Sequence, residues 1–168
     1  MNKKIIIVII VLLATLSVSG CIKTPMDNIN NIIPSLSQNI EIGDANYNEA
    51  VTYLNSHNYD LAEEKVQTSS NNFLEAKNKM LEINKYNENI NDTLYLQYLN
   101  LIEEELNLKE NATSNLQLAI QNFKKGNKVV ANNYVSTANK LMNQGISIQN
   151  QRNNLVKNNP DKFKEVNQ

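Results

Sequence analysis

Between residues 44 and 125 the chain has no glycine or proline, and its apolar residues recur at the spacing of an α-helix. The clearest pattern predicts a helix from Asp60 to Lys85. Its apolar and small residues follow alternating steps of four and three along one face: Ala62, Val66, Ser69, Phe73, Ala76, Met80 and Ile83. Such a seven-residue repeat predicts a stripe that packs against a second helix lying nearly parallel or antiparallel to it.

A shorter helix is predicted before this one. Asp44 is a good N-cap for it and Ser56 its end, with one apolar face formed by Tyr47, Ala50, Val51 and Leu54. The next residues, His57 to Asp60, predict a turn. His57, the only histidine of the chain, is therefore expected to be a solvated or capping turn residue.

Two long helices are predicted after it. One runs from Thr93, capped by Asp92, to Lys125 and is ended by Gly126; its stripe is Tyr95, Leu99, Ile102, Leu106, Lys109, Thr113, Leu116, Ile120 and Phe123. The other runs from Lys128 to Lys157. Its stripe is weaker, because Gly145 and Arg152 interrupt it, and it contains Val130, Tyr134, Thr137, Leu141, Ile148 and Leu155.

These elements predict an all-α fold, an up-and-down bundle of about four helices over residues 44–157 in which the second, third and fourth helices are long. Residues 86–92 are rich in asparagine and indicate a bend, with a continuous helix as the alternative. Residues 21–43 contain Pro25, Pro34 and Gly43, which favour a flexible tether. The sequence Asn158-Asn159-Pro160 stops the last helix and leaves a polar tail over residues 158–168.

The chain also contains an internal similarity at an offset of 69 residues. Residues 54–62 align with residues 123–131, Val66 with Val135 and Phe73 with Met142. An apolar residue, a Gly/Asn turn and an apolar-Ala pair resemble the hairpin of tetratricopeptide repeats, which implies stacked helical hairpins. The intervening helices are longer than in those repeats and other signature positions are missing, so a bundle with recurring hairpins is the favoured interpretation.

The N-terminus has the pattern of a signal peptide. Lys3 and Lys4 precede an apolar stretch from Ile5 to Val18, which is shorter than the roughly 20 residues that a membrane-spanning helix needs. The stretch ends in Val18-Ser19-Gly20-Cys21, which resembles the lipobox of prokaryotic membrane lipoproteins.

That resemblance implies cleavage between Gly20 and Cys21 and a diacylglyceryl thioether on Cys21. The mature chain would then be held at the extracytoplasmic face of the cell membrane by its lipid. An ordinary secretory signal that leaves Cys21 as a free thiol is the alternative. Cys21 is the only cysteine, which excludes an intramolecular disulfide and leaves packing to hold the domain together.

Removal of residues 1–20 deletes two lysines and no acids, so the 16 basic residues become 14 against 17 acidic ones, a net charge of −3. A slightly acidic body argues against a nucleic-acid partner and against electrostatic binding to anionic lipid. Asparagine makes up about a fifth of the chain, so the glycosylation sequons at Asn91 and Asn111 match the number expected by chance.

The sequence predicts no catalytic, cofactor-binding or metal site. One histidine and one cysteine cannot form a triad or a zinc site. The acidic run Glu103-Glu104-Glu105 is interpreted as a solvated helix face, with Glu105 placed four residues before Lys109 to form a helix ion pair. The chain is therefore predicted not to be an enzyme.

Two functions remain. The first is a lipid-anchored interaction or scaffold module at the cell envelope, whose partner is another envelope protein. The alternative is an exported helical bundle that binds or senses a small molecule between its helices. Lys109 and Thr113 favour the alternative, because they are a polar break in an apolar stripe, although a lysine there more often extends its charge to solvent.

Overall fold

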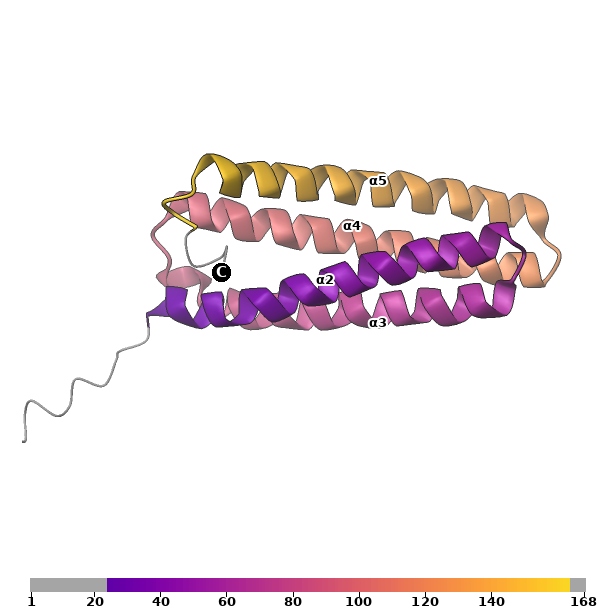
Figure 1. The fold of residues 1–168 in the computed structure, drawn as a ribbon, viewed down its shortest axis with the longest axis horizontal. Helices are drawn as coiled ribbons and strands as arrows, with labels where there is room; N and C mark the ends of the chain where they lie inside the picture. The colour runs from indigo at the N-terminus through magenta and orange to yellow at the C-terminus, as the bar shows by residue number, and fades with distance from the viewer. Residues whose placement is uncertain (1–23, 164–168) are drawn as a thin grey trace, which may run out of the picture.

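The computed structural model describes residues 24–163, which form an up-and-down bundle of four long helices (Figure 1). These are α2 (Pro25–Asn55), α3 (Tyr59–Asn84), α4 (Thr93–Lys124) and α5 (Lys128–Asn158), with a short 3-10 helix, η2 (Asn87–Asn89), between α3 and α4. The all-α class is confirmed. Within these residues no helix is long and apolar enough to cross a bilayer. The predicted signal peptide and Cys21 lie outside the described residues.

The predicted tether is wrong from Pro25 onward, because α2 begins there and runs through Gly43. Thr24 forms a capping box with Asp27: its hydroxyl accepts from the Asp27 N–H at 3.2 Å, and the Asp27 carboxylate accepts from the Thr24 N–H at 2.7 Å. Proline is well tolerated at the first helical position, where no N–H partner is needed. The cap and Pro25 are therefore signals that start a helix.

Proline and glycine inside α2 are retained because one face of the helix is buried. Pro34 is exposed, so its ring faces solvent. The buried face, which outweighs the local preference of Pro34 and Gly43 for a loop, consists of Ile29, Ile33, Leu36, Ile40, Gly43, Tyr47, Ala50 and Leu54. The first helix is consequently as long as the others, and Asp44, predicted as an N-cap, lies in its middle.

Small residues let the helices of each hairpin approach closely. Between α2 and α3 the seam contains Gly43, Ala50, Ala62, Ser69 and Ala76, all buried. The Ser69 hydroxyl donates to the Gly43 carbonyl oxygen at 2.8 Å. A Cβ atom on Gly43 would lie 2.6 Å from the Phe73 ring, so this contact requires glycine.

The buried face of α5 is rotated about the helix axis relative to the predicted stripe. The predicted residues Val130 and Thr137 are exposed, whereas the buried residues are Ala131, Ala138, Met142, Gly145 and Arg152. These pack on α4, which presents Ala112 and Ala119. The helices meet through their smallest side chains, and the larger apolar residues of α5 flank the contact.

The stripe predicted for α3 is confirmed at all seven positions.

The offset of 69 residues relates the two hairpins throughout. α2 corresponds to α4 and α3 to α5, and each small seam residue aligns with another: Gly43 with Ala112, Ala50 with Ala119, Ala62 with Ala131, Ser69 with Ala138 and Ala76 with Gly145. The turns correspond as well, because His57 (φ 62°) and Gly126 (φ 79°) share a left-handed conformation. The bundle is thus one hairpin built twice.

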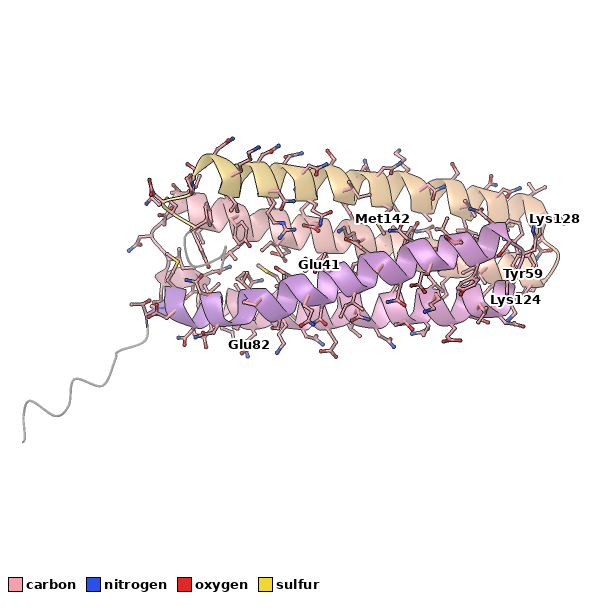
Figure 2. All side chains as sticks on the ribbon, in the orientation of Figure 1. Glu41, Tyr59, Glu82, Lys124, Lys128 and Met142 are labelled. Atoms are coloured by element: carbon pink, nitrogen blue, oxygen red, sulfur yellow. The ribbon has the colours of Figure 1, made fainter. Side chains whose placement is uncertain are left out.

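The hairpins join mainly through α3 and α4, and α2 does not pack along α5 within the described chain. Both hairpins turn at the same end, where Tyr59 stacks on Phe123 with ring centroids 5.7 Å apart and Lys124 lies close by (Figure 2). Lys124 bonds Asp60 and Glu63 at 2.8 and 2.6 Å, which raises its pKa to about 12.

The opposite end is closed by the segment that follows α5. Phe163 is fully buried and packs on Tyr95 and Tyr98, with ring centroids 6.0 and 5.2 Å apart. Lys162 bonds Asp92, the N-cap of α4, at 2.7 Å. The predicted polar tail is therefore wrong as far as Phe163, because an aromatic residue beyond the helix stop returns to the core.

Candidate functional site

A fully buried lysine lies at the centre of the bundle. The Lys109 ammonium donates to Asp44 Oδ2 at 2.6 Å, to Glu105 Oε1 at 2.8 Å and to Gln149 Oε1 at 3.4 Å. All three N–H bonds of the ammonium thus have an acceptor. The expectation that Lys109 extends its charge to solvent is wrong, because both Lys109 and Glu105 are 0% exposed.

The network continues from Glu105 to α5. Arg152 Nε lies 3.1 Å from Glu105 Oε2, so Asp44, Lys109, Glu105 and Arg152 form an alternating chain of two acids and two bases with no net charge. Glu105 is therefore buried and does not belong to a solvated acidic face, although its predicted bond to Lys109 is confirmed. Neutrality matters because an uncompensated charge at this depth would be strongly destabilising.

The other hairpin has apolar residues at the same places. At the offset of 69, Glu105 corresponds to Leu36, Lys109 to Ile40, Gln149 to Met80 and Arg152 to Ile83. Leu36, Ile40 and Ile83 are buried with at most 1% exposure. At equivalent positions, the first hairpin therefore has buried apolar side chains and the second has buried charged or polar side chains.

Gly145 makes room for the lysine stem. A Cβ atom on Gly145 would lie 3.0 Å from Lys109 Cγ, tighter than ordinary van der Waals contact. The corresponding pair in the first hairpin is Ala76 with Ile40. The smaller glycine therefore accompanies the larger side chain.

Burial governs protonation at this site. Desolvation raises the pKa of Asp44 above 3.8, outweighing the opposing charge and hydrogen bond of Lys109. Burial also raises the pKa of the Tyr98 phenol, against the effect of the nearby Arg152 charge. The negative form of Asp44 is thus held at an energetic disadvantage even though it is paired.

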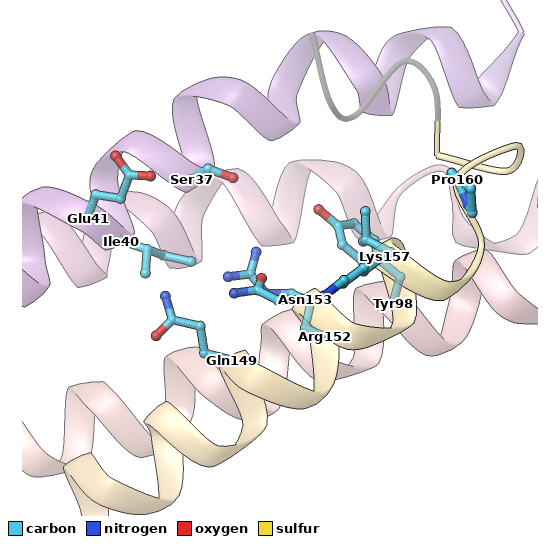
Figure 3. Close-up of a pocket in the computed structure, with 10 residues that line it drawn as sticks. Ser37, Ile40, Glu41, Tyr98, Gln149, Arg152, Asn153, Lys157 and Pro160 are labelled. Atoms are coloured by element: carbon cyan, nitrogen blue, oxygen red, sulfur yellow. The ribbon is translucent and has the colours of Figure 1, made fainter.

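A cleft opens beside the network, between α2 and α5 (Figure 3). It has a volume of about 590 Å³. Arg152 reaches from α5 into the space between the two helices. The lining residues are Ser37, Ile40 and Glu41 of α2, Tyr98 of α4, Gln149, Arg152, Asn153, Val156 and Lys157 of α5, and Pro160 after it.

The two walls differ in chemistry. The α5 wall presents a guanidinium, an ammonium and two amides, which makes it rich in hydrogen-bond donors. The α2 wall presents the Glu41 carboxylate and the Ser37 hydroxyl. Convergent polar groups around a partly apolar hollow are typical of a ligand-binding site.

Of the two polar residues predicted to interrupt the apolar stripe, Lys109 belongs to the buried network and Thr113 does not. Thr113 is buried, and its hydroxyl donates to the Lys109 carbonyl oxygen at 2.8 Å, so it serves the helix and not the cleft. Glu103 and Glu104 are exposed. His57 is exposed at the hairpin turn, as expected. Over residues 24–163 no group of three or more His, Cys, Asp or Glu residues is placed to hold a metal ion.

Sequence reasoning misses Asp44, Gln149 and Arg152 as site residues. The α5 stripe makes Arg152 look like an interruption, when it occupies the buried position itself. The signal that identifies it is the offset of 69, which places Arg152 opposite Ile83 in the alignment. No known protein family, curated protein or solved structure matches this chain.

We predict that replacing one charged residue of the network destabilises the protein, whereas replacing all four with uncharged residues does not. Lys109→Met should lower the free energy of unfolding by about 3–5 kcal/mol, because Arg152 alone then remains beside two buried acids and one negative charge is left uncompensated. The fourfold variant Asp44→Thr, Glu105→Leu, Lys109→Ile, Arg152→Ile carries at each site the residue found 69 positions away in the other hairpin. Its free energy of unfolding should equal or exceed that of the wild type. Urea denaturation of both variants, followed by circular dichroism, measures the difference. A fourfold variant less stable than Lys109→Met would show that the fold itself needs the charges.

A second prediction concerns pH. Because the folded-state pKa of Asp44 is raised, the folded protein binds this proton more tightly than the unfolded chain does. The stability contribution of Asp44 should therefore fall as pH rises from about 3.8, its unfolded value, through the raised folded value. The measured quantity is the difference in unfolding free energy between wild type and Asp44→Asn from pH 3 to 8. A difference that grows in favour of wild type with rising pH would mean that the Lys109 pair outweighs desolvation.

Proposed function

We propose that this protein is a lipid-anchored extracytoplasmic binding module, and not an enzyme, that receives a small ligand in the cleft between α2 and α5. The anchor is supported by the lipobox resemblance at Val18 to Cys21. The binding role is supported by the polar cleft beside Arg152. Of the two functions that the sequence leaves open, this geometry favours the small-molecule-binding alternative over the scaffold.

The observation that carries the binding role is the difference between the hairpins. One hairpin builds the layer from Leu36, Ile40 and Ile83, which shows that the fold has an apolar solution at these positions. A buried ion network is weak as a source of stability compared with hydrocarbon of similar volume. The charges in the other hairpin therefore have a use beyond packing, and they lie where the cleft opens.

Anchoring at Cys21 would place this cleft near the membrane. Pro25 follows Cys21 by four positions, which span at most about 14 Å when fully extended. The first cleft residue on α2, Ser37, lies twelve residues after Pro25, or about 18 Å along the helix axis. Without the predicted tether, the lipid would hold the cleft in the half of the bundle nearest the bilayer.

A second candidate, the interaction or scaffold module with an envelope protein as partner, has its own supporting observation. Leu74 and Leu81 are 50% and 58% exposed on α3, and they lie seven residues apart on one face. A partner helix could pack on such a pair. This surface is on a different helix from the cleft, so the two functions are separable by mutation.

The anchor is tested by variants of its cysteine. The native protein should have the mass of residues 21–168 plus a diacylglyceryl group and should enter the detergent phase in Triton X-114 partition. Cys21→Ser should lack the added mass of the diacylglyceryl group, because the thiol is the lipid acceptor. The matched control, Ser19→Ala, keeps a small residue at the cleavage site and should behave as wild type. A native protein with its original Met1 terminus, or with a free thiol on Cys21, would contradict the proposal.

A further inference from the structure

We propose that the cleft binds a short free peptide, with the peptide carboxylate on Arg152 and Lys157 of α5 and its terminal ammonium facing Glu41 of α2. This inference rests on the proposed binding function of the cleft and names the chemistry of its ligand. It follows from the burial of Arg152, from the amides between the charges and from the opposite charges of the two walls.

Arg152 is prepared to bind a carboxylate. Its side chain is only 10% exposed, and Glu105 Oε2 lies 3.1 Å from its Nε. A guanidinium carries five N–H donors in a rigid plane. The Nε–H makes no hydrogen bond among residues 24–163, and the Tyr98 hydroxyl interacts with the guanidinium. The terminal N–H groups that remain can donate to a second acceptor. Carboxylates accept such paired donors in a bidentate geometry that a lysine cannot offer. Arg152 also lines the cleft, so a ligand reaches it from solvent.

Amide side chains on the same wall suit the peptide groups of a ligand. Gln149 Oε1 accepts from Lys109 at 3.4 Å, which orients the amide and leaves its NH₂ group to donate to a ligand carbonyl. Asn153 lies one residue beyond Arg152 and offers both a donor and an acceptor. Ile40 and Tyr98 add apolar surface for ligand side chains. The wall thus combines peptide-like polar partners with hydrocarbon.

The two walls have opposite charges with no internal partner. The side chains of Glu41 and Lys157 take part in no hydrogen bond or ion pair among residues 24–163. One lies on α2 and the other on α5, on either side of the cleft (Figure 3). A ligand with a carboxylate at one end and an ammonium at the other matches this polarity, whereas a simple anion would leave Glu41 unpaired.

The volume indicates more than one amino acid. The cleft has a volume of about 590 Å³. Binding sites for small molecules have volumes of about 300 to 1,000 Å³. A free peptide of a few residues fits this space, and its two charged ends are far enough apart to face different walls.

The test uses the full-length protein in detergent micelles, labelled with ¹⁵N, and three equimolar libraries of randomised tripeptides. One library has free ends, one is amidated at the C-terminus and one is acetylated at the N-terminus. The free library should shift the side-chain amide signals of Gln149 and Asn153 in a saturable manner. Amidation should weaken the apparent affinity about tenfold or more, since it removes the acceptor of a largely buried arginine. Acetylation should weaken it about threefold, because Glu41 is exposed.

Variants separate the two contacts. Glu41→Gln should bind the free and acetylated libraries equally, and the fourfold variant that lacks Arg152 should lose the preference for a free carboxylate while remaining folded. Glu104→Gln, an exposed acid on α4 outside the cleft, should behave as wild type. Equal shifts with all three libraries would overturn the inference but leave the cleft as a binding site. No shift with any library would overturn the inference and remove the binding function proposed for the cleft, whereas anchoring is decided separately by the Cys21 variants.

Discussion

The close antiparallel contact between helices with small seam residues determines the rest of this structure. Gly43, Ser69 and their counterparts at the offset of 69 bring the backbones of each pair together, and the dispersion attraction between closely packed backbones compensates for the small side chains. The larger apolar residues are then left on the sides of each hairpin, where they join α3 to α4. Each hairpin is therefore a complete unit, and α2 and α5 need not pack on each other. The open side between α2 and α5 is where the cleft forms.

The second hairpin uses this frame differently from the first. Lys109 can be buried because Gly145 gives its stem room and because three acceptors surround its ammonium. Arg152 completes the neutral chain of charges and extends it to the edge of the cleft. Hydrogen bonds from the Lys109 ammonium offset only part of the cost of dehydrating these groups. Among residues 24–163, Asp44 Oδ1, Glu105 Oε2 and Arg152 Nε are buried without a hydrogen bond, and an apolar layer would serve stability as well or better. The stability of the fold therefore does not explain the network, and this is the basis of the binding role proposed for the cleft.

The sequence predicts the parts of the fold in which local and tertiary preferences agree. The α3 stripe, the Asp92 cap and the turn at Gly126 are all as expected. The prediction fails where tertiary contact overrides a local signal. Pro34 and Gly43 favour a loop, but burial of the α2 face keeps them helical. In α5 the predicted stripe contains the β-branched residues Val130 and Thr137, whereas close packing buries the smaller neighbours Ala131, Ala138 and Gly145. The same preference conceals Arg152, because a charged residue does not look like a core position unless the two hairpins are aligned.

The central claim is the register of α4 against α5, on which the network and the cleft both depend. The most direct measurement is disulfide formation by Leu108→Cys with Gly145→Cys in a Cys21→Ser background. A Cβ atom on Gly145 would lie 3.6 Å from Leu108 Cβ, within the range of about 3.5–4.5 Å that a disulfide requires. It would also lie 3.0 Å from Lys109 Cγ, so the flexible lysine stem must shift by a few tenths of an ångström in this variant. Mild oxidation should crosslink this pair almost completely without loss of helicity, while the neighbouring pair Leu108→Cys with Ile146→Cys, which moves the second thiol to an exposed position, should crosslink slowly. Failure of the first pair to crosslink, or equal crosslinking of both, would contradict the account.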